Sequence, residues 1–216
     1  MGVLMLTLKA SAPLAFLAMA LAASASLPVE EIDLDLPPSE RWTAFGRKYR
    51  ADIISRCQHQ AKMYRRGLGR DVAARWVEAA PLDDELLAEF GSLVKAVNHR
   101  DVTPACLILT DMWSAVDAPT FGCTGLLAAM PNGTVIHGRN IDYDIVEVAR
   151  QARITGAGVG GSSLYEGVFV KGGKPLATFL GSPGGLGIHT GMRPGAYSVN
   201  SNARVKNDTM LDNLKA

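Results

Sequence analysis

Apolar residues in the first half of the chain recur at the spacing of an α-helix. After Pro37 and Pro38, this spacing predicts a helix that begins at Ser39, its expected N-cap, and runs to about residue 68. The same pattern predicts further helices over residues 71–80, 81–98 and 104–116. We interpret these as core helices. The alternative is that their aromatic faces contact lipid.

The pattern changes after Thr120, where glycines separate short alternating segments. These segments predict strands over residues 124–130, 134–140, 164–171, 175–180, 186–189 and 196–200. Helices followed by strands predict an α+β fold with an antiparallel sheet. The glycine-rich run 156–161 lacks the strand-then-helix context of a nucleotide loop, so we interpret it as a connection.

The N-terminus has the features of a signal peptide over residues 1–25. Lys9 precedes an apolar run at 12–23, which is short for a membrane span, and Ala23 to Ala25 forms a small-x-small cleavage site. A membrane anchor is the alternative. Removal of the peptide predicts a lysosomal or secreted protein, or a periplasmic or extracellular one in a bacterium.

Charge and cysteine content exclude several classes of protein. The 22 basic and 21 acidic side chains nearly cancel and form no basic stripe, so no nucleic-acid partner is expected. We also expect no metal and no cofactor. Of the three cysteines, Cys57 and Cys106 are a candidate disulfide that the sequence leaves open, and Cys123 would then be free. Two sequons make Asn132 and Asn207 candidate glycosylation sites.

The segment from Cys123 to Tyr143 reads as a hairpin with charged residues near one end. Asn132 and Gly133 predict a two-residue type I′ turn, which would place Cys123 opposite Asp142. In that register Arg139 needs a bulge, at Gly138, to reach the thiol. A longer turn would shift the register.

Together, a thiol, a cation and a carboxylate fit nucleophilic catalysis. A cut before Cys123 would free its α-amino group as the base for the thiol, as in N-terminal-nucleophile hydrolases. Asp142 would hold the resulting ammonium, and Arg139 would orient the acyl carbonyl. The alternative is that Cys123 is a small packing residue and that Arg139 and Asp142 form a surface ion pair.

Five stretches of the sequence resemble the acid ceramidase family, which includes N-acylethanolamine-hydrolysing acid amidase. Cys123 with Thr124, followed by HGRNIDY at 137–143, is similar to the family's nucleophile hairpin. The other stretches match in order, at residues 32–42, 178–181 and 191–198.

The resemblance implies an αββα sandwich of the N-terminal-nucleophile type, and self-cleavage between Gly122 and Cys123. It implies a helical α-subunit at 26–122 and a β-subunit at 123–216, which contains the first part of the sandwich. Cys123 would be the nucleophile, with Arg139 and Asp142 as catalytic neighbours and Asn202 and Arg204 as substrate contacts. The expected reaction hydrolyses N-acylethanolamines or ceramides to a fatty acid and an amine through a thioester, at a membrane surface or lipid micelle.

The sequence also departs from the family pattern. Ala203 stands where the family has a glutamate, and a later asparagine and arginine have no counterpart, so we expect a sandwich that is incomplete at its C-terminal end. The alternative function is therefore a truncated lipid-associating relative with weak or no catalysis. Acylases of bile-salt or penicillin type also use an N-terminal cysteine, but the long helical segment before Cys123 disfavours them.

Overall fold

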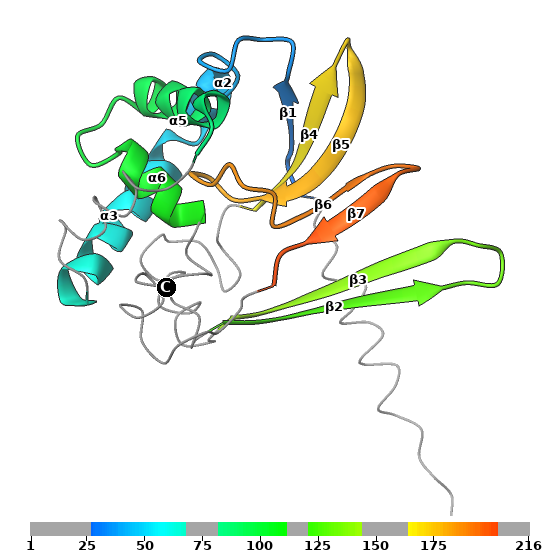
Figure 1. The fold of residues 1–216 in the computed structure, drawn as a ribbon. Helices are drawn as coiled ribbons and strands as arrows, with labels where there is room; N and C mark the ends of the chain where they lie inside the picture. The colour runs from blue at the N-terminus through cyan, green and yellow to red at the C-terminus, as the bar shows by residue number, and fades with distance from the viewer. Residues whose placement is uncertain (1–26, 68–81, 112–120, 144–163, 203–216) are drawn as a thin grey trace, which may run out of the picture.

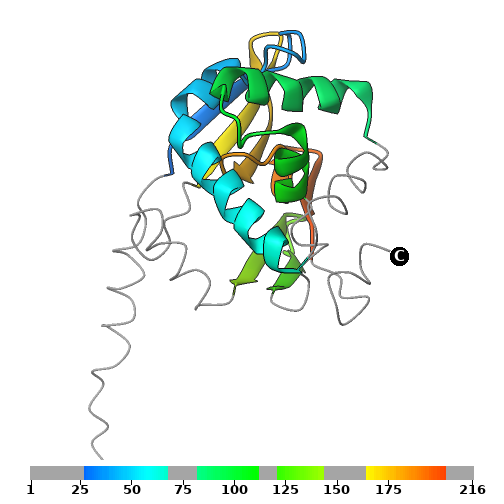
Figure 2. The same ribbon diagram turned by 90° about the vertical axis from the view of Figure 1, so that its left-hand side faces the viewer.

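The computed structural model describes residues 27–67, 82–111, 121–143 and 164–202, with side chains for 27–62, 82–111, 123–140 and 164–202. In this part of the chain, helices gather on one side of a five-stranded sheet, and a two-stranded hairpin extends beside the far end of that sheet (Figure 1). The helices lie in front of the sheet when it is viewed from their side (Figure 2). The predicted α+β class is confirmed at this level. The predicted signal peptide and the glycine run 156–161 lie outside the described residues.

The helices largely follow the apolar spacing. They are α2 (Thr43–Lys48), α3 (Arg50–Gly67), α5 (Asp84–Val97) and α6 (Pro104–Asp111). The predicted N-cap at Ser39 is wrong, because residues 37–41 form turns on the carbonyl of Pro37 and the helix begins after Trp42. Tyr49 separates α2 from α3, where a single helix was predicted. The helix predicted at 71–80 and the end of the one predicted at 104–116 lie outside the described residues.

The larger sheet is mixed, not purely antiparallel as predicted. Its strand order is β1-β4-β5-β6-β7, in which β1 pairs parallel with β4 and every other pair is antiparallel. The strands are β1 (Val29–Asp33), β4 (Tyr165–Lys171), β5 (Lys174–Gly181), β6 (Thr190–Arg193) and β7 (Tyr197–Asn200). The prediction of a strand at 186–189 is wrong, since the strand begins only at Thr190. β1 was not predicted, because its acidic residues obscured the apolar alternation.

An aromatic cluster joins the helices to this sheet. Trp42, Phe45 and Tyr49 contribute from α2 and its ends, and Tyr165 and Phe179 from the sheet, with successive ring centroids 4.6 to 5.9 Å apart. Two glycines make room for it. A Cβ at Gly167 would lie 2.1 Å from the Phe179 ring, and one at Gly181 would lie 2.4 Å from the Tyr165 ring. These cross-strand pairs therefore require glycine opposite each ring.

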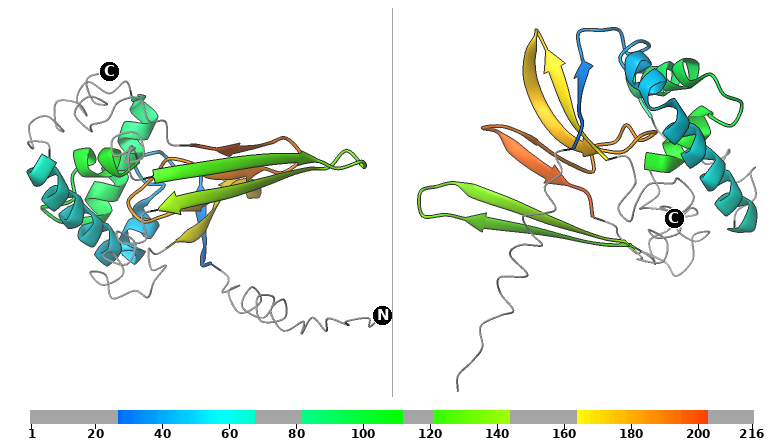
Figure 3. Two further views of the ribbon diagram at one scale, coloured as in Figure 1. Left: turned by 90° about the horizontal axis from the view of Figure 1, so that it is seen from below. Right: turned by 180° about the vertical axis from the view of Figure 1, so that it is seen from behind.

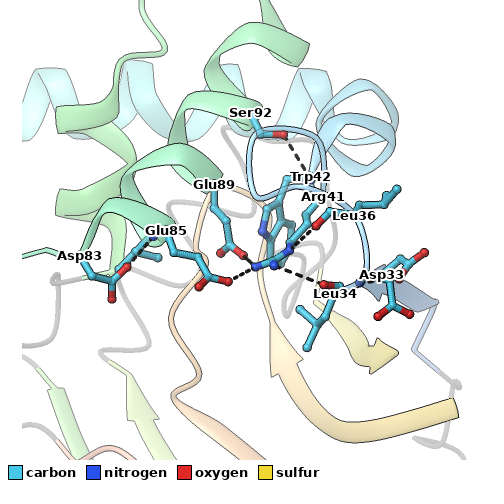
Figure 4. A network of polar contacts seen from close by, with 11 residues as sticks. Asp33, Leu34, Leu36, Arg41, Trp42, Asp83, Glu85, Glu89 and Ser92 are labelled. Atoms are coloured by element: carbon cyan, nitrogen blue, oxygen red, sulfur yellow. Dashed lines mark hydrogen bonds and ion pairs between the residues drawn. The ribbon is translucent and has the colours of Figure 1, made fainter. Parts of the chain in front are cut away.

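Arg41 fastens the segment after β1 to α5 (Figure 4). Its guanidinium pairs with Glu85 and with Glu89, the latter at 2.8 Å, and donates to the carbonyls of Leu34 and Leu36. The Trp42 backbone N–H also donates to the Ser92 hydroxyl on α5, at 3.3 Å. These bonds satisfy backbone groups of a segment that is itself neither strand nor helix.

Cys57 on α3 and Cys106 on α6 form a disulfide, which leaves Cys123 as the free cysteine. Within the described residues, no helix has the length and apolar character needed to cross a membrane. No cluster of three or more His, Cys, Asp or Glu side chains in the same ranges is arranged to hold a metal ion.

The hairpin of β2 (Phe121–Ala129) and β3 (Val135–Tyr143) projects away from the helices and runs beside β6 and β7 (Figure 3). It exposes apolar side chains to an unusual degree. Leu126 and Leu127 are both 66% exposed, although neighbouring residues of a strand face opposite sides, and Val135 and Ile136 are 60% and 53% exposed. The apolar part of the hairpin next to its loop is thus exposed on both faces.

A matched pair of leucine substitutions tests this division between core and hairpin. Leu93 is fully buried, so Leu93→Ala should lower the free energy of unfolding by about 2–5 kcal/mol through lost contacts and a residual cavity. Leu126→Ala should change it by less than about 0.5 kcal/mol, because that side chain is already in water. Urea unfolding of both variants gives the comparison, and a larger loss for Leu126→Ala would contradict the fold.

Candidate active site

A three-residue loop at 131–133 closes the β2–β3 hairpin. The Met130 N–H donates to the Thr134 carbonyl at 2.8 Å, and the Gly133 N–H donates to the Met130 carbonyl at 2.9 Å. Gly133 has a positive φ of 84°, but Asn132 does not, so the predicted type I′ turn is wrong. The loop is one residue longer than predicted, with glycine in the left-handed position typical of such hairpins.

The longer loop shifts the register by one residue. Cys123 pairs with Ile141, and Asp142 pairs with Gly122, so the predicted opposition of Cys123 and Asp142 is wrong. A one-residue shift exchanges the two faces of a strand. The backbone of Asp142 lies instead across from the residue before the cysteine.

The same shift brings Arg139 onto the face of Cys123. Arg139 pairs with Gly125, two residues along from the cysteine, and its Nη2 donates to the Cys123 Sγ at 3.5 Å. The predicted bulge at Gly138 is wrong, because the pairing continues regularly through that residue. The structure therefore brings the predicted thiol and cation into direct contact without an irregular ladder.

Backbone and hydroxyl oxygens hold the Arg139 guanidinium from the other sheet. Nη1 donates to the His189 carbonyl and the Thr190 hydroxyl, and Nη2 donates to the Ser201 carbonyl at 2.5 Å. The Ser201 N–H donates in turn to the His189 carbonyl at 2.8 Å. Among the described residues, Arg139 Nε is buried without a hydrogen-bond partner. The fork of Arg139 thus joins the hairpin to the start of β6 and the end of β7.

His137 makes a second connection between the hairpin and β7. Its two ring nitrogens lie 2.7 Å from the Ser198 hydroxyl and 2.7 Å from the Asn200 side-chain oxygen. The Asn200 amide lies over Gly125, where an added Cβ would come within 2.9 Å of it. Gly125 therefore lets β7 approach the hairpin next to the Cys123–Arg139 contact.

Burial and the nearby Arg139 charge both lower the pKa of His189 below its ordinary value of 6.5. The imidazole is consequently neutral at physiological pH. The Arg139 guanidinium therefore has no second positive charge from His189 beside it.

A groove of about 810 Å³ lies between the hairpin and strands β5 to β7. Its size is within the range of small-molecule sites. His137 and Arg139 are among the hairpin residues that line it, whereas Cys123 is half-buried and is not part of the lining. Arg139 is thus the group that touches both the groove and the thiol.

Asp111, the last residue of α6, lies under the loop that leads into β6. Its Oδ2 accepts hydrogen bonds from the Leu186 and Gly187 N–H groups, at 2.9 and 3.0 Å. Burial of the carboxyl group raises its pKa to about 6, against the lowering effect of those two bonds and of Arg56. The ionised carboxylate is therefore held at a cost in desolvation.

The remaining predicted residues are only partly described. Asn202 is exposed and accepts a hydrogen bond from the Asn200 amide at 2.6 Å. Asn132 is exposed in the hairpin loop, where its side chain caps the Thr134 N–H at 3.0 Å. Arg204, Asn207 and Ala203, and the side chain of Asp142, lie outside the described residues.

Sequence reasoning missed several groups around the site. Asp111, His189 and Asn200 are separated along the chain and belong to no shared motif, whereas His137 lies in the HGRNIDY stretch but was given no role. The available signal was indirect: an aspartate in an otherwise apolar helical segment, and glycines at 185 and 187, which the structure places against that aspartate.

One family model matches residues 25–81 of the chain. It describes the β-subunit of N-acylethanolamine-hydrolysing acid amidase. The match fits an arrangement of two subunits from one precursor. Its description applies the word beta to a segment before Cys123, for which the sequence predicted the α-subunit.

Two curated relatives match most of this chain. An N-acylethanolamine-hydrolysing acid amidase of Caenorhabditis elegans is 29% identical over 193 residues, covering 85% of this chain and 50% of the relative. The Mus musculus protein of the same name is 25% identical over 186 residues, covering 83% and 46%. The chain therefore spans about half the length of these relatives.

Removal of Arg139 should reduce the reactivity of the free thiol. A guanidinium beside a cysteine attracts the negatively charged sulfur that reacts with electrophiles, so Arg139→Ala should slow alkylation of Cys123 by iodoacetamide about three- to tenfold at neutral pH. Arg139→Lys, which keeps the charge but loses the planar fork, should give an intermediate rate. The exposed Arg47→Ala is the control, and equal rates for all variants would contradict the contact.

The pH dependence of stability tests the enclosure of Asp111. Because its native pKa of about 6 exceeds the ordinary 3.8, the native state binds the proton more tightly than the unfolded state does. The stability of the wild type relative to Asp111→Asn should therefore fall by roughly 3 kcal/mol as the pH rises from about 4 to 6, and then level off.

Urea unfolding of the wild type and of Asp111→Asn across this pH range gives the difference in their free energies of unfolding. The contributions of the other carboxylates are common to both proteins and cancel in this difference. Among the described residues, the charged and titratable groups near Asp111 are Arg56, Tyr165 and His189. Of these, only His189 titrates near this range, and its lowered pKa is a reason to repeat the comparison in His189→Gln. A difference that is flat with pH would show that the carboxyl group is solvated.

Proposed function

We propose that this chain is a member of the acid ceramidase and N-acylethanolamine-hydrolysing acid amidase family, to which it is similar, and that it carries the nucleophile of a self-processing lipid amidase. The observation that supports this most directly is the contact between Arg139 and the free thiol of Cys123, at 3.5 Å. A packing cysteine needs no guanidinium, and Arg139 is itself held by three oxygen acceptors from the neighbouring sheet.

The first step is hydrolysis of the Gly122–Cys123 peptide bond. Water is consumed, Gly122 gains a carboxylate, and Cys123 gains a free α-amino group. The Cα register pairs Asp142 with Gly122, so its backbone lies at this bond and not opposite the sulfur. In this proposal Asp142 lies at the bond that is cleaved and then holds the new ammonium group of Cys123.

The second step is attack on the lipid amide. The α-amino group of Cys123 accepts the thiol proton, and the sulfur forms a bond to the acyl carbonyl carbon. Arg139 offers its unpartnered Nε–H and its charge toward the developing oxyanion. The amine leaves with the proton, a thioester remains, and water hydrolyses it to a fatty acid and restores the thiol.

The hairpin is proposed to be part of the second sheet of an αββα sandwich. Strands that are buried on both faces are apolar on both faces, and Leu126, Leu127, Val135 and Ile136 have this character while exposed. The relatives are about twice the length of the matched region. We propose that full activity requires further polypeptide that covers these residues.

Other parts of the assignment follow from the resemblance. N-acylethanolamines or ceramides are the proposed substrates, taken from a membrane surface or micelle, with Asn202 and Arg204 as substrate contacts. The leader at 1–25 supports a lysosomal or secreted location, or a periplasmic or extracellular one in a bacterium. Asn132 lies in an exposed loop, as glycosylation there would require.

A second candidate function is lipid association without turnover. The exposed apolar hairpin and the alanine at position 203 favour it. Flotation with liposomes, run in parallel with an amidase assay, separates the two. Binding without turnover supports this second function, and turnover by the chain excludes it.

Intact mass after incubation at acidic pH tests the proposed processing. The wild type should yield two fragments divided between Gly122 and Cys123, and Cys123→Ala should remain whole. Both cysteines of the disulfide precede the cut, so the fragments should separate on mass without reduction. An Arg47→Ala control should cleave as the wild type does. Absence of the break, or the same break in Cys123→Ala, would contradict the mechanism.

A further inference from the structure

Asp111 lies at the boundary between the helices and the proposed catalytic residues. It ends α6, and its carboxylate binds the loop that runs from the end of β5 to β6. No step of the proposed reaction uses it. It is half-buried, and its carboxylate is bound by two backbone N–H groups of one loop, so its role depends on what that loop positions.

The loop is built around this carboxylate. A Cβ at Gly185 would lie 2.7 Å from Asp111 Oδ1, and a Cβ at Gly187 would lie 3.5 Å from it. On the other side, Gly184 packs toward Arg56 and Leu107, at 3.5 and 3.8 Å from its own hypothetical Cβ. The glycines of the loop therefore pack directly against α3 and α6, where a side chain would collide or reduce the space.

The loop also determines where the acceptors of Arg139 lie. The Gly187 N–H bonded to Asp111 is two residues before the His189 carbonyl and three before the Thr190 hydroxyl, and both of these accept from Arg139. A short segment whose start is fixed by two hydrogen bonds has little freedom at its end. The contacts thus run from α6, through the loop and Arg139, to the Cys123 sulfur.

We propose that Asp111 is a positioning residue for Arg139, and that it sets the guanidinium against Cys123 by fixing the loop that carries the Arg139 acceptors. This inference rests on the proposed function, because it assigns Asp111 to the same reaction. Asp111 touches neither the sulfur nor the groove among the described contacts, so its effect passes through Arg139.

A double-mutant cycle on alkylation of Cys123 tests the proposal. Asp111→Ala removes both acceptor oxygens and should slow alkylation by iodoacetamide about threefold or more at neutral pH. In the Arg139→Ala background the same change should alter the rate by less than about 1.5-fold, because residues that act as one unit are not additive. Asp111→Asn retains an acceptor and should stay within about twofold of the wild type.

Three further variants keep the test decisive if Asp111→Ala fails to fold. Gly185→Ala leaves the acid in place but pushes a Cβ against it, and it should slow alkylation in the same way. Gly91→Ala on α5, where an added Cβ meets nothing within 4 Å, should not. Asp83→Ala is the control for lost stability. It removes the N-cap of α5, where the Asp83 side chain accepts from the Leu86 N–H, and it does not contact the loop.

The outcomes separate this inference from the proposed function. Equal slowing by Asp111→Ala with and without Arg139, or slowing by Asp83→Ala to the same extent, would overturn the positioning role. Alkylation requires neither self-cleavage nor lipid turnover. A chain that shows the coupling but never cleaves would therefore retain the positioning role and lose the amidase assignment.

Discussion

The register of the β2–β3 hairpin is the constraint on which the site depends. In a strand pair, a shift of one residue exchanges the two faces of the ladder. The loop at 131–133, with glycine alone in the left-handed conformation, sets the register in which Arg139 shares a face with Cys123. A two-residue turn would have placed the arginine on the opposite face, and the contact with the sulfur would then have required a distortion of the strands.

Arg139 acts as the joint between the two sheets because its acceptors are almost all on the far side. The His189 and Ser201 carbonyls both accept from the guanidinium, and the Ser201 N–H donates to the His189 carbonyl, which holds the two residues together. His137, two residues earlier on the same face, binds β7 in a similar way. Two polar side chains thus hold a hairpin whose apolar residues contribute little burial, since Leu126 and Ile136 remain mostly in water.

The sequence predicted elements with a strong local signal and failed where geometry depends on distant residues. α5 follows its apolar stripe closely, with Asp83 as the cap and Asn98 in a left-handed conformation at its end. The type of the hairpin turn was mistaken, because an Asn-Gly pair fits both a two-residue loop and the observed loop with glycine last. Residues 186–189 have strand-like composition, but the Leu186 and Gly187 N–H groups donate to Asp111 instead of a strand, and β6 starts only at Thr190. No periodicity in the sequence reports such a tertiary competitor.

The hydrophobic core contains residues from both sides of the peptide bond that the proposed mechanism cuts. Cleavage before Cys123 would fall within β2. It would place β1, all the described helices and the first two residues of β2 in one piece, and the rest of β2 with β3 to β7 in the other. Yet β1 pairs with β4 over five residues, and Trp42, Phe45 and Tyr49 pack on Tyr165 and Phe179 across the same division. Asp111 adds hydrogen bonds from the first piece to the loop of the second. Because burial of large aromatic side chains is a major source of stability, the two pieces would remain one folded body after the cut. The new amino group of Cys123 would then arise beside a guanidinium that is already held in place, which is the arrangement a preorganised nucleophile requires.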